Sequence, residues 1–181
     1  KVIINFIWRA SQGIKEIKDR FMLYTKEKIV GHCFFTEKFF HHGCHCLDLI
    51  LFLTNSYNSS SIKLEKFENN YRLTSKKVDI FFSPVPKNIN EFSFSLLSKN
   101  TKLVFDGFKN KIVFFKKGKI AKLSDKPKYY LEIKTLKLDI FNYQKNIYSD
   151  IYKLLNKQKT NICFSNEAKI NANLILNAEK K

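Results

Sequence analysis

Residues 92–115 read FSFSLLSKNTKLVFDGFKNKIVFF and give the clearest indication of the architecture. Phenylalanine and leucine alternate with serine over 92–96, which is the period-two pattern of a strand with one covered face. Leu103 and Phe105 then lead into Asp106-Gly107, a dipeptide that favours a tight turn between two strands. An apolar run follows at 112–115. The stretch therefore predicts consecutive antiparallel strands of one sheet.

The same pattern extends to both sides of this stretch. Apolar residues alternate with charged ones over 62–65 and 77–80, and Pro84 and Pro86 mark a break between strands. The run Leu131–Phe141 also alternates, but its phase slips near Thr135-Leu136, where we expect a β-bulge. Ile29–Phe35 is rich in β-branched and aromatic residues, and Lys1–Ile7 also has strand character.

Helical spacing occurs near both ends of the chain. Ile14, Ile17, Phe21 and Tyr24 recur every three or four residues after Ser11, a suitable capping residue. Cys44–Leu53 is apolar on nearly all sides and predicts a buried helix, followed by a loop over 55–61. An apolar stripe over 147–155 predicts a further helix, and Ser165 with Glu167 predicts the capped start of a last one.

Strands between helices predict an α+β fold formed by residues 1–181 as a single domain. We expect a predominantly antiparallel open sheet with helices packed on one face. The other face of the sheet is then free for subunit association.

Lysine dominates the charge of the chain. The 33 Lys and Arg residues face 16 Asp and Glu, which gives a formal net charge of +17, and only Arg9, Arg20 and Arg72 are arginine. Proteins that recognise phosphates and bases favour arginine, because its planar fork binds them bidentately. We therefore interpret the lysines as solvated surface and expect no nucleic-acid partner. The competing hypothesis of a lysine-rich nucleic-acid binder predicts affinity that falls steeply with salt.

Length and composition favour a folded domain without a membrane span. A chain of this size buries roughly 70% of the surface that its unfolded form exposes, and 18 Phe and 8 Tyr supply apolar area. The most apolar run, Cys44–Leu53, has about half the length of a membrane helix. No signal-peptide pattern follows Lys1. Four cysteines suit a reducing compartment, so we expect a cytoplasmic protein.

Residues 41–48, HHGCHCLD, are the segment best suited to chemistry. Histidine has the side-chain pKa nearest neutrality and is the natural proton carrier. Gly43 lets the backbone turn tightly or approach a ligand closely. His45 would then lie in the first turn of a buried helix, and Asp48, three residues later, can reach the same face and orient its ring.

Two other interpretations of this segment stay open. The histidines and cysteines are ligands that zinc accepts, but their spacing is not a common closed zinc pattern and Cys163 is isolated. Alternatively, Cys44 and Cys46 are small buried apolar residues, and the histidines are surface or packing residues.

The order and spacing of these elements resemble the C-terminal domain of the Gfo/Idh/MocA family of NAD(P)-dependent sugar and polyol oxidoreductases. Asn5–Ser11, with the helix at Ile14, is similar to the first strand and helix of that domain. Gly43–Ile50 is similar to its Gly-x-His-x-x-Asp helix start, and 103–107 with 111–114 to its sheet hairpin. Residues 143–150 and 164–168 resemble its closing helices. The likeness covers nearly the whole chain.

The resemblance implies that His45 is the catalytic histidine, which assists proton transfer at a substrate hydroxyl while hydride moves to or from NAD or NADP. Asp48, His41 and Arg9 are the implied substrate-binding or supporting residues. An acidic residue usually stands four positions before the histidine, and here that position is His41. The chain has no Gly-rich dinucleotide fingerprint of its own, so the resemblance implies that the cofactor is bound mainly by another domain.

Two functional hypotheses follow from the resemblance. The first is the substrate-binding and dimerisation part of an oxidoreductase that acts on a sugar, polyol or nucleotide-sugar hydroxyl or carbonyl, with a homo-oligomer formed through the sheet. The second is a non-catalytic interaction module derived from the same domain, which the histidine at position 41 and the missing cofactor fingerprint favour.

Overall fold

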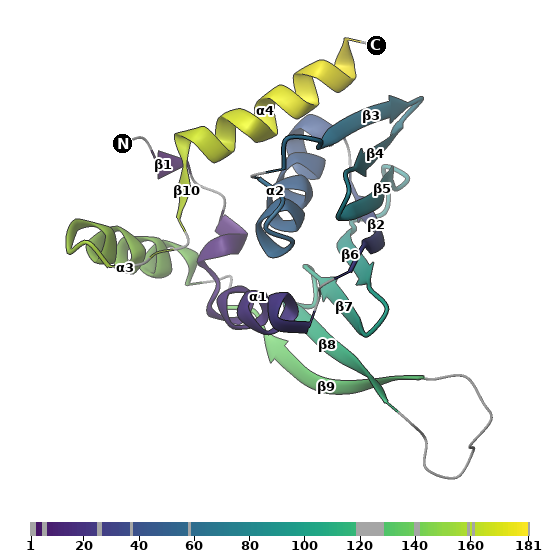
Figure 1. Ribbon diagram of the computed structural model, residues 1–181. Helices are drawn as coiled ribbons and strands as arrows, with labels where there is room; N and C mark the ends of the chain where they lie inside the picture. Colours follow the sequence, from purple (N-terminus) through teal and green to yellow (C-terminus); the bar gives the residue numbers. More distant parts are fainter. Residues whose placement is uncertain are drawn as a thin grey trace.

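The computed structural model is an α+β fold in which helices cover one face of an eight-stranded sheet (Figure 1). It describes residues 3–4, 7–24, 27–36, 38–57, 59–118, 129–139, 142–158, 160 and 162–180. The helices are α1 (Gln12–Tyr24), α2 (Cys44–Leu53), α3 (Tyr143–Leu155) and α4 (Ser165–Glu179), with a 3₁₀ turn η1 (Ile7–Ala10) and a π-helical turn η2 (Phe39–Gly43). The strands are β1 (Ile3–Ile4), β2 (Ile29–Phe35), β3 (Lys63–Phe67), β4 (Asn70–Thr74), β5 (Val78–Pro84), β6 (Phe92–Leu97), β7 (Thr101–Asp106), β8 (Lys111–Gly118), β9 (Tyr129–Lys137) and β10 (Cys163–Phe164).

The large sheet has the strand order β3-β4-β5-β2-β6-β7-β8-β9, so β2 lies at its centre. β2 is parallel to β5, with Ile29 opposite Val78, and antiparallel to β6, with Val30 opposite Leu97. The other neighbouring pairs of the described strands are antiparallel. The predicted α+β fold with a predominantly antiparallel open sheet is therefore confirmed. β1 and β10 form a separate antiparallel pair.

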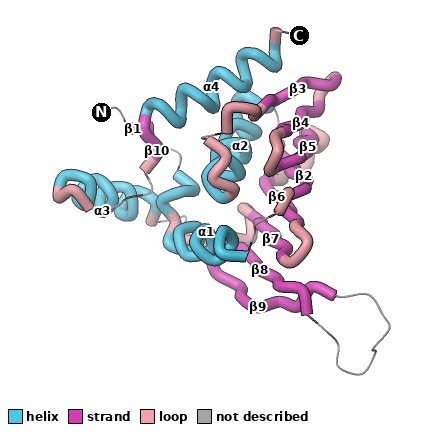
Figure 2. Tube along the Cα trace, viewed as in Figure 1, coloured by secondary structure: helices cyan, strands magenta, loops and turns pink. Residues whose placement is uncertain are grey.

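The two faces of the sheet differ in what covers them. Figure 2 shows α1, α2 and α4 on the same side of the strand layer. In β2 the side chains of Ile29, Cys33 and Phe35 are buried, whereas those of Val30 and Phe34 are 47% and 39% exposed. This alternation is the period-two pattern of the sequence, and it separates a core face from an outer face.

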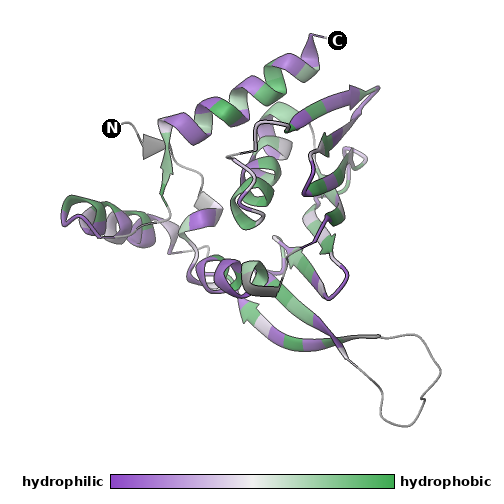
Figure 3. Ribbon diagram, viewed as in Figure 1, coloured by the Kyte–Doolittle hydropathy of each residue, from purple (hydrophilic) through white to green (hydrophobic). Residues whose placement is uncertain are grey.

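The core lies between α2 and the sheet. Residues 46–53 of α2 are buried, and Figure 3 colours this helix as mostly hydrophobic. Trp8 of η1 stacks on Phe92 with ring centroids 4.7 Å apart and meets the ring of Phe105 edge-on at 5.2 Å. Loss of one such buried aromatic side chain typically costs about 3–5 kcal/mol, so these contacts firmly fix η1 against the sheet.

The hairpin that the sequence predicts is present. β7 ends at Asp106, β8 begins at Lys111, and Asn110 has the left-handed φ of 51° that closes such a turn. β5 ends at Pro84, as the prolines predicted. The β-bulge lies two residues before the predicted position: Phe114 pairs with Lys134 and Phe115 with Glu132, so Ile133 is the extra residue. Thr135 and Leu136 remain in register with β8.

Two predictions near helix starts need correction. In the predicted strand Lys1–Ile7, only Ile3–Ile4 is a strand, and Ile7 begins η1; residues 1, 2, 5 and 6 lie outside the described residues. Ser165 does not cap α4 but is its first residue, after Phe164 in extended conformation. Glu167 Oε2 accepts the backbone N–H of Phe164 at 3.4 Å, so the acidic residue supplies the cap.

Within the described part of the chain, every helix is too short or too polar to cross a membrane.

Candidate functional site at the start of α2

Gly43 joins η2 to α2 for a reason that differs from the predicted one. Its φ of −61° and ψ of −32° are ordinary helical values, so the position does not require glycine for its backbone conformation. A Cβ at this position would lie 2.4 Å from Cδ2 of Phe39. The ring of Phe39 stacks on Tyr71 at 3.9 Å and meets Phe35 edge-on. Glycine therefore allows this aromatic cluster to pack directly on the start of α2.

His45 lies in the first turn of α2, as predicted, and is half-buried. Burial lowers the pKa of its imidazole below the ordinary value of 6.5, and the neighbouring His42 lowers the pKa further. Both effects favour the neutral form of the ring. A neutral imidazole can accept a proton from a hydroxyl group, which is the chemistry expected of a general base.

Asp48 faces Arg9 rather than His45. Nε of Arg9 donates to Oδ2 of Asp48 at 2.7 Å and Nη2 donates to Oδ1 at 2.5 Å, while the hydroxyl of Tyr57 also donates to Oδ1. The carboxylate of Asp48 is thus occupied on both oxygens. The predicted orientation of His45 by Asp48 is wrong, because the side chain three residues along the helix points to η1 instead.

Arg9 is correspondingly a buried structural residue. The side chains of Arg9 and Asp48 are 2% and 1% exposed. Nη1 of Arg9 also donates to Oε2 of Glu167 at 2.8 Å, and its guanidinium lies over the ring of Phe52. Burial opposes the charge, but the hydrogen bonds to Asp48 raise the pKa of Arg9 above its ordinary value. This buried ion pair joins η1, α2 and α4, and Arg9 does not line the cavity described below.

Sequence reasoning missed Tyr57 and Glu167 as members of this cluster. Tyr57 lies in the segment that the composition predicted to be a loop, and Glu167 was noticed only as an acidic residue in a helix start. Arg9 is separated from Asp48 by 39 positions and from Glu167 by 158. No local periodicity reports contacts at such separations.

A cavity of about 840 Å³ opens beside η2. We call it the η2 pocket. It lies among η2, the β3–β4 hairpin, the segment after β5 and the end of α4. Its lining residues are Phe35, Lys38, Phe39, Phe40, His41, Lys66, Asn69, Tyr71, Pro84, Val85, Pro86, Lys87 and Glu179.

His41 connects this pocket to His45. It is exposed, lines the pocket and lies four residues before His45 in continuous helical backbone, which corresponds to about one turn. His41 occupies the position at which the resemblance expects an acidic residue. The structure therefore brings His41 and His45 to one end of α2, whereas Arg9 and Asp48 form a separate buried pair.

The described residues provide no support for the zinc hypothesis. Among them, no three His, Cys, Asp or Glu side chains meet in a metal-binding arrangement. Cys46 is fully buried, and Sγ of Cys44 donates to the carbonyl oxygen of His41 at 3.3 Å.

Comparison with known proteins identifies the fold but not the function. The sequence matches no protein-family model and no curated protein sequence. Solved structures similar to the chain include a UDP-N-acetylglucosamine 3-dehydrogenase from Acidithiobacillus ferrooxidans (TM-score 0.63, 10% identity, 97% of this chain and 61% of that chain covered). Another is a dehydrogenase from Clostridium difficile, with a TM-score of 0.62, 15% identity, and 99% of this chain and 62% of that chain covered. A third is a super-repressor mutant of Gal80p from Saccharomyces cerevisiae, with a TM-score of 0.64, 12% identity, and 99% of this chain and 62% of that chain covered.

These neighbours define the class of fold. The chain has the fold found in Gfo/Idh/MocA-type oxidoreductases, and the predicted resemblance is confirmed at that level. The chain spans 61–62% of the length of these neighbours. Since one of them is a repressor and two are dehydrogenases, the fold alone does not determine the activity.

Proposed function

We propose that this chain is the substrate-binding and dimerisation part of an NAD(P)-dependent oxidoreductase that acts on a hydroxyl or carbonyl group of a sugar, polyol or nucleotide-sugar. The observation that carries the proposal is His45: a half-buried imidazole with a lowered pKa, one helical turn from a pocket, in a fold shared with dehydrogenases. These features suit proton transfer at the substrate oxygen.

The roles of the residues follow from their positions. In the oxidation direction, neutral His45 accepts the hydroxyl proton, and in the reduction direction the protonated ring returns it. His41 lies beside the pocket and contacts the substrate there. Arg9 and Asp48 keep α2, and thereby His45, fixed against η1.

The cofactor does not fit the residues of this chain. A dinucleotide needs a Gly-rich turn between a strand and a helix, and the 181 residues contain no such sequence. When bound by another domain, a nicotinamide would supply the hydride acceptor or donor.

The experiment is an activity screen of the protein expressed from its complete reading frame. Sugars, polyols and nucleotide-sugars are offered with NAD⁺ or NADP⁺, and formation of the reduced nicotinamide is followed by absorbance. His45→Ala is expected to lower kcat by about 10²–10⁴-fold, the usual effect of removing a general acid or base. His42→Ala removes the neighbouring imidazole that lowers the pKa of His45 and is the comparison variant. It leaves the proposed proton acceptor in place and is expected to retain most of the turnover. Equal activity of wild type and His45→Ala would contradict the proposal.

We propose association of two copies through the outer face of the sheet. Val30 and Phe34 of β2 and Phe81 of β5 are 39–47% exposed on this face, and β2 and β5 are neighbours. An apolar group at the centre of a sheet suits a subunit interface. Sedimentation equilibrium of wild type and of Phe34→Asp/Phe81→Asp tests this: a dimer that dissociates in the variant is expected.

A non-catalytic interaction module is the second candidate. The observation that favours it is His41 in place of the usual acidic residue, together with the repressor among the structural neighbours. It predicts the same dimer without turnover in the activity screen. For either function we propose a cytoplasmic location, because all four cysteines are free.

A further inference from the structure

The η2 pocket has the size of a small-molecule site. Its volume of about 840 Å³ is within the usual range of roughly 300–1,000 Å³ for ligand pockets. A bare inorganic ion would leave most of this volume empty. His45 is not among its lining residues, so binding in the pocket does not depend on the proposed catalytic chemistry.

One wall of the pocket is aromatic and firmly held. The ring of Phe39 stacks on Tyr71 at 3.9 Å and meets Phe35 and Phe82 edge-on at 5.3 and 5.4 Å. The hydroxyl of Tyr71 donates to Glu179 at the end of α4. Phe40 is 64% exposed and is available for contact with a ligand. Such a wall suits the planar or apolar body of a ligand.

The rim of the pocket is positively charged. Among the described residues, three lysines line it together with one carboxylate, that of Glu179. Nζ of Lys66 already pairs with Glu179 at 2.5 Å. In the described part of the chain, Lys38 and Lys87 pair with no carboxylate. Two cations at one pocket rim, with no counter-charge from the residues that the structure describes, attract an anion.

The two segments that carry these lysines are joined by hydrogen bonds. The backbone N–H of Val85 donates to the carbonyl oxygen of Phe35 at 3.0 Å. Oγ1 of Thr36 accepts the N–H of Glu91 at 2.7 Å, and its single proton is shared between the carbonyl oxygens of Ile89 and Glu91 at 3.2 and 3.1 Å. The backbone around Lys38 and that around Lys87 are therefore tied together before any ligand binds, which reduces the entropic cost of binding.

We propose that the η2 pocket binds an organic phosphate: a phosphate ester whose ring lies against Phe39 and Phe40 and whose phosphate is held by Lys38 and Lys87. A phosphomonoester carries about −1.5 to −2 charges at pH 7. It therefore neutralises two lysines more fully than a ligand with a single carboxylate would. Lysine is an established partner of phosphate as a point charge. This inference rests on the proposed function in one respect: it names the ligand class of the pocket in which that function places the substrate. Binding of the organic phosphate itself needs neither His45 nor a nicotinamide.

The test is isothermal titration calorimetry with AMP, phenyl phosphate and glucose 6-phosphate, in a buffer of near-physiological salt without nicotinamide. Two control probes are used: adenosine has a ring but no phosphate, and inorganic phosphate has no ring. We expect saturable binding of at least one organic phosphate, at least about tenfold tighter than that of adenosine or inorganic phosphate. No saturable binding of any of the three esters would overturn the proposal.

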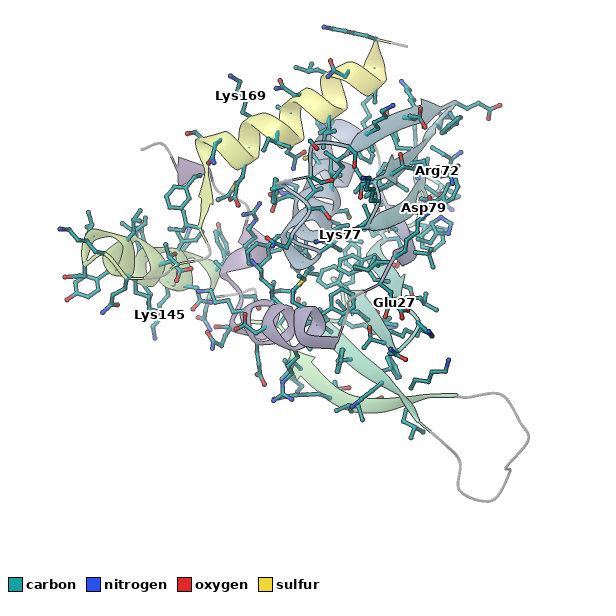
Figure 4. The ribbon with its side chains drawn as sticks, in the orientation of Figure 1. Glu27, Arg72, Lys77, Asp79, Lys145 and Lys169 are labelled. Atoms are coloured by element: carbon teal, nitrogen blue, oxygen red, sulfur yellow. The ribbon has the colours of Figure 1, made fainter. Side chains whose placement is uncertain are left out.

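Variants distinguish binding at this site from the non-specific attraction of anions to a chain with a net charge of +17. Lys38→Ala/Lys87→Ala is expected to weaken binding of the organic phosphate by about tenfold or more, because charged hydrogen bonds are lost. Lys77→Ala/Lys169→Ala removes the same charge from exposed positions outside the pocket lining (Figure 4) and is expected to change affinity less than about twofold. Equal weakening by both pairs would show non-specific attraction and overturn the proposal.

A third variant distinguishes this proposal from the proposed function. His45→Ala is expected to leave the affinity for the organic phosphate within about twofold of wild type while abolishing most turnover. Binding without turnover in the wild type would contradict the oxidoreductase and leave the pocket intact. Circular dichroism of each variant confirms that it is folded.

Discussion

The Arg9–Asp48 pair and the rim of the η2 pocket both contain charged side chains, but the two regions differ in burial and in pairing. In the pair, both side chains are buried and their hydrogen bonds are made within the protein. At the rim, Lys38 and Lys87 are exposed and have no carboxylate partner in the described residues. Charge alone therefore does not mark a binding site. A charge that is already paired within the protein holds the fold together, whereas an unpaired charge at a pocket is available to a ligand.

The sharpest contrast is in stability. Arg9→Met is expected to lower the free energy of unfolding by about 3–5 kcal/mol, because it leaves Asp48 as a buried charge without its ion-pair partner. Arg20→Met is the matched control, since Arg20 forms a half-exposed pair with Glu16 on α1, and a change below about 1 kcal/mol is expected. Urea unfolding measures both. If the two variants lost equal stability, the structural role of Arg9 would be wrong.

The second prediction concerns the glycine between the two regions. Gly43→Ala is expected to cost about 1–3 kcal/mol, because the added methyl group would overlap the ring of Phe39 at 2.4 Å. Gly13→Ala is the comparison variant: its Cβ would lie 3.1 Å from Cδ2 of Leu138 and 3.2 Å from the carbonyl oxygen of Lys137. Both contacts are longer than the 2.4 Å at Gly43, and alanine favours a helix, so a smaller cost is expected. Thermal unfolding distinguishes the variants, and a neutral Gly43→Ala would contradict the packing argument.

The smallest effect is expected for an ion pair on the outer face of the sheet. Its side chains are less buried than those of Arg9 and Asp48. Arg72 and Asp79 point toward each other on β4 and β5 (Figure 4), and Nε of Arg72 donates to Oδ1 of Asp79 at 2.8 Å. Hydrogen bonding to Arg72 lowers the pKa of Asp79 to about 2. Because Arg72 is 38% exposed, Asp79→Asn is expected to cost only about 0.5–1 kcal/mol at pH 7.

The pH dependence of that effect has a definite sign. The folded-state pKa of Asp79 is below its ordinary value of 3.8, so the stabilisation is complete above that value and is lost as the pH falls toward 2. Urea unfolding of wild type and Asp79→Asn across this range should show the two stabilities converging in acid. A difference that stays constant with pH would show that Asp79 does not stabilise through its charge.

Most of the fold was predictable because its determinants are local. The alternation over 92–105 and the turn at Asp106-Gly107 fix two strands and their connection, and the all-apolar Cys44–Leu53 marks the buried helix at its observed bounds. The β-bulge was displaced by two residues because an alternation shows that the phase changes, but the pairing with β8 decides which residue is extra. The start of α4 was misassigned because Glu167, rather than Ser165, supplies the cap.

The candidate site was predictable only in part. Its location at the start of α2 followed from the residues 41–48, but the partner of Asp48 could not, because Arg9 is 39 positions away. The helical spacing of His45 and Asp48 predicted that Asp48 orients the His45 ring. In the structure, the carboxylate of Asp48 instead bonds Arg9. The η2 pocket is formed by four segments that are distant in sequence, and none of them carries a motif.

The proposed role of His45 as a proton acceptor requires an imidazole pKa below the ordinary value of 6.5. NMR titration of the imidazole resonances, with His45→Gln used to assign the His45 signal, should give a pKa for His45 below 6.5. If the proposed oxidoreductase activity is detected, the acidic limb of its kcat/KM profile for substrate oxidation should fall at that same low pKa. A pKa for His45 at or above 6.5, or a profile without this limb, would contradict the account.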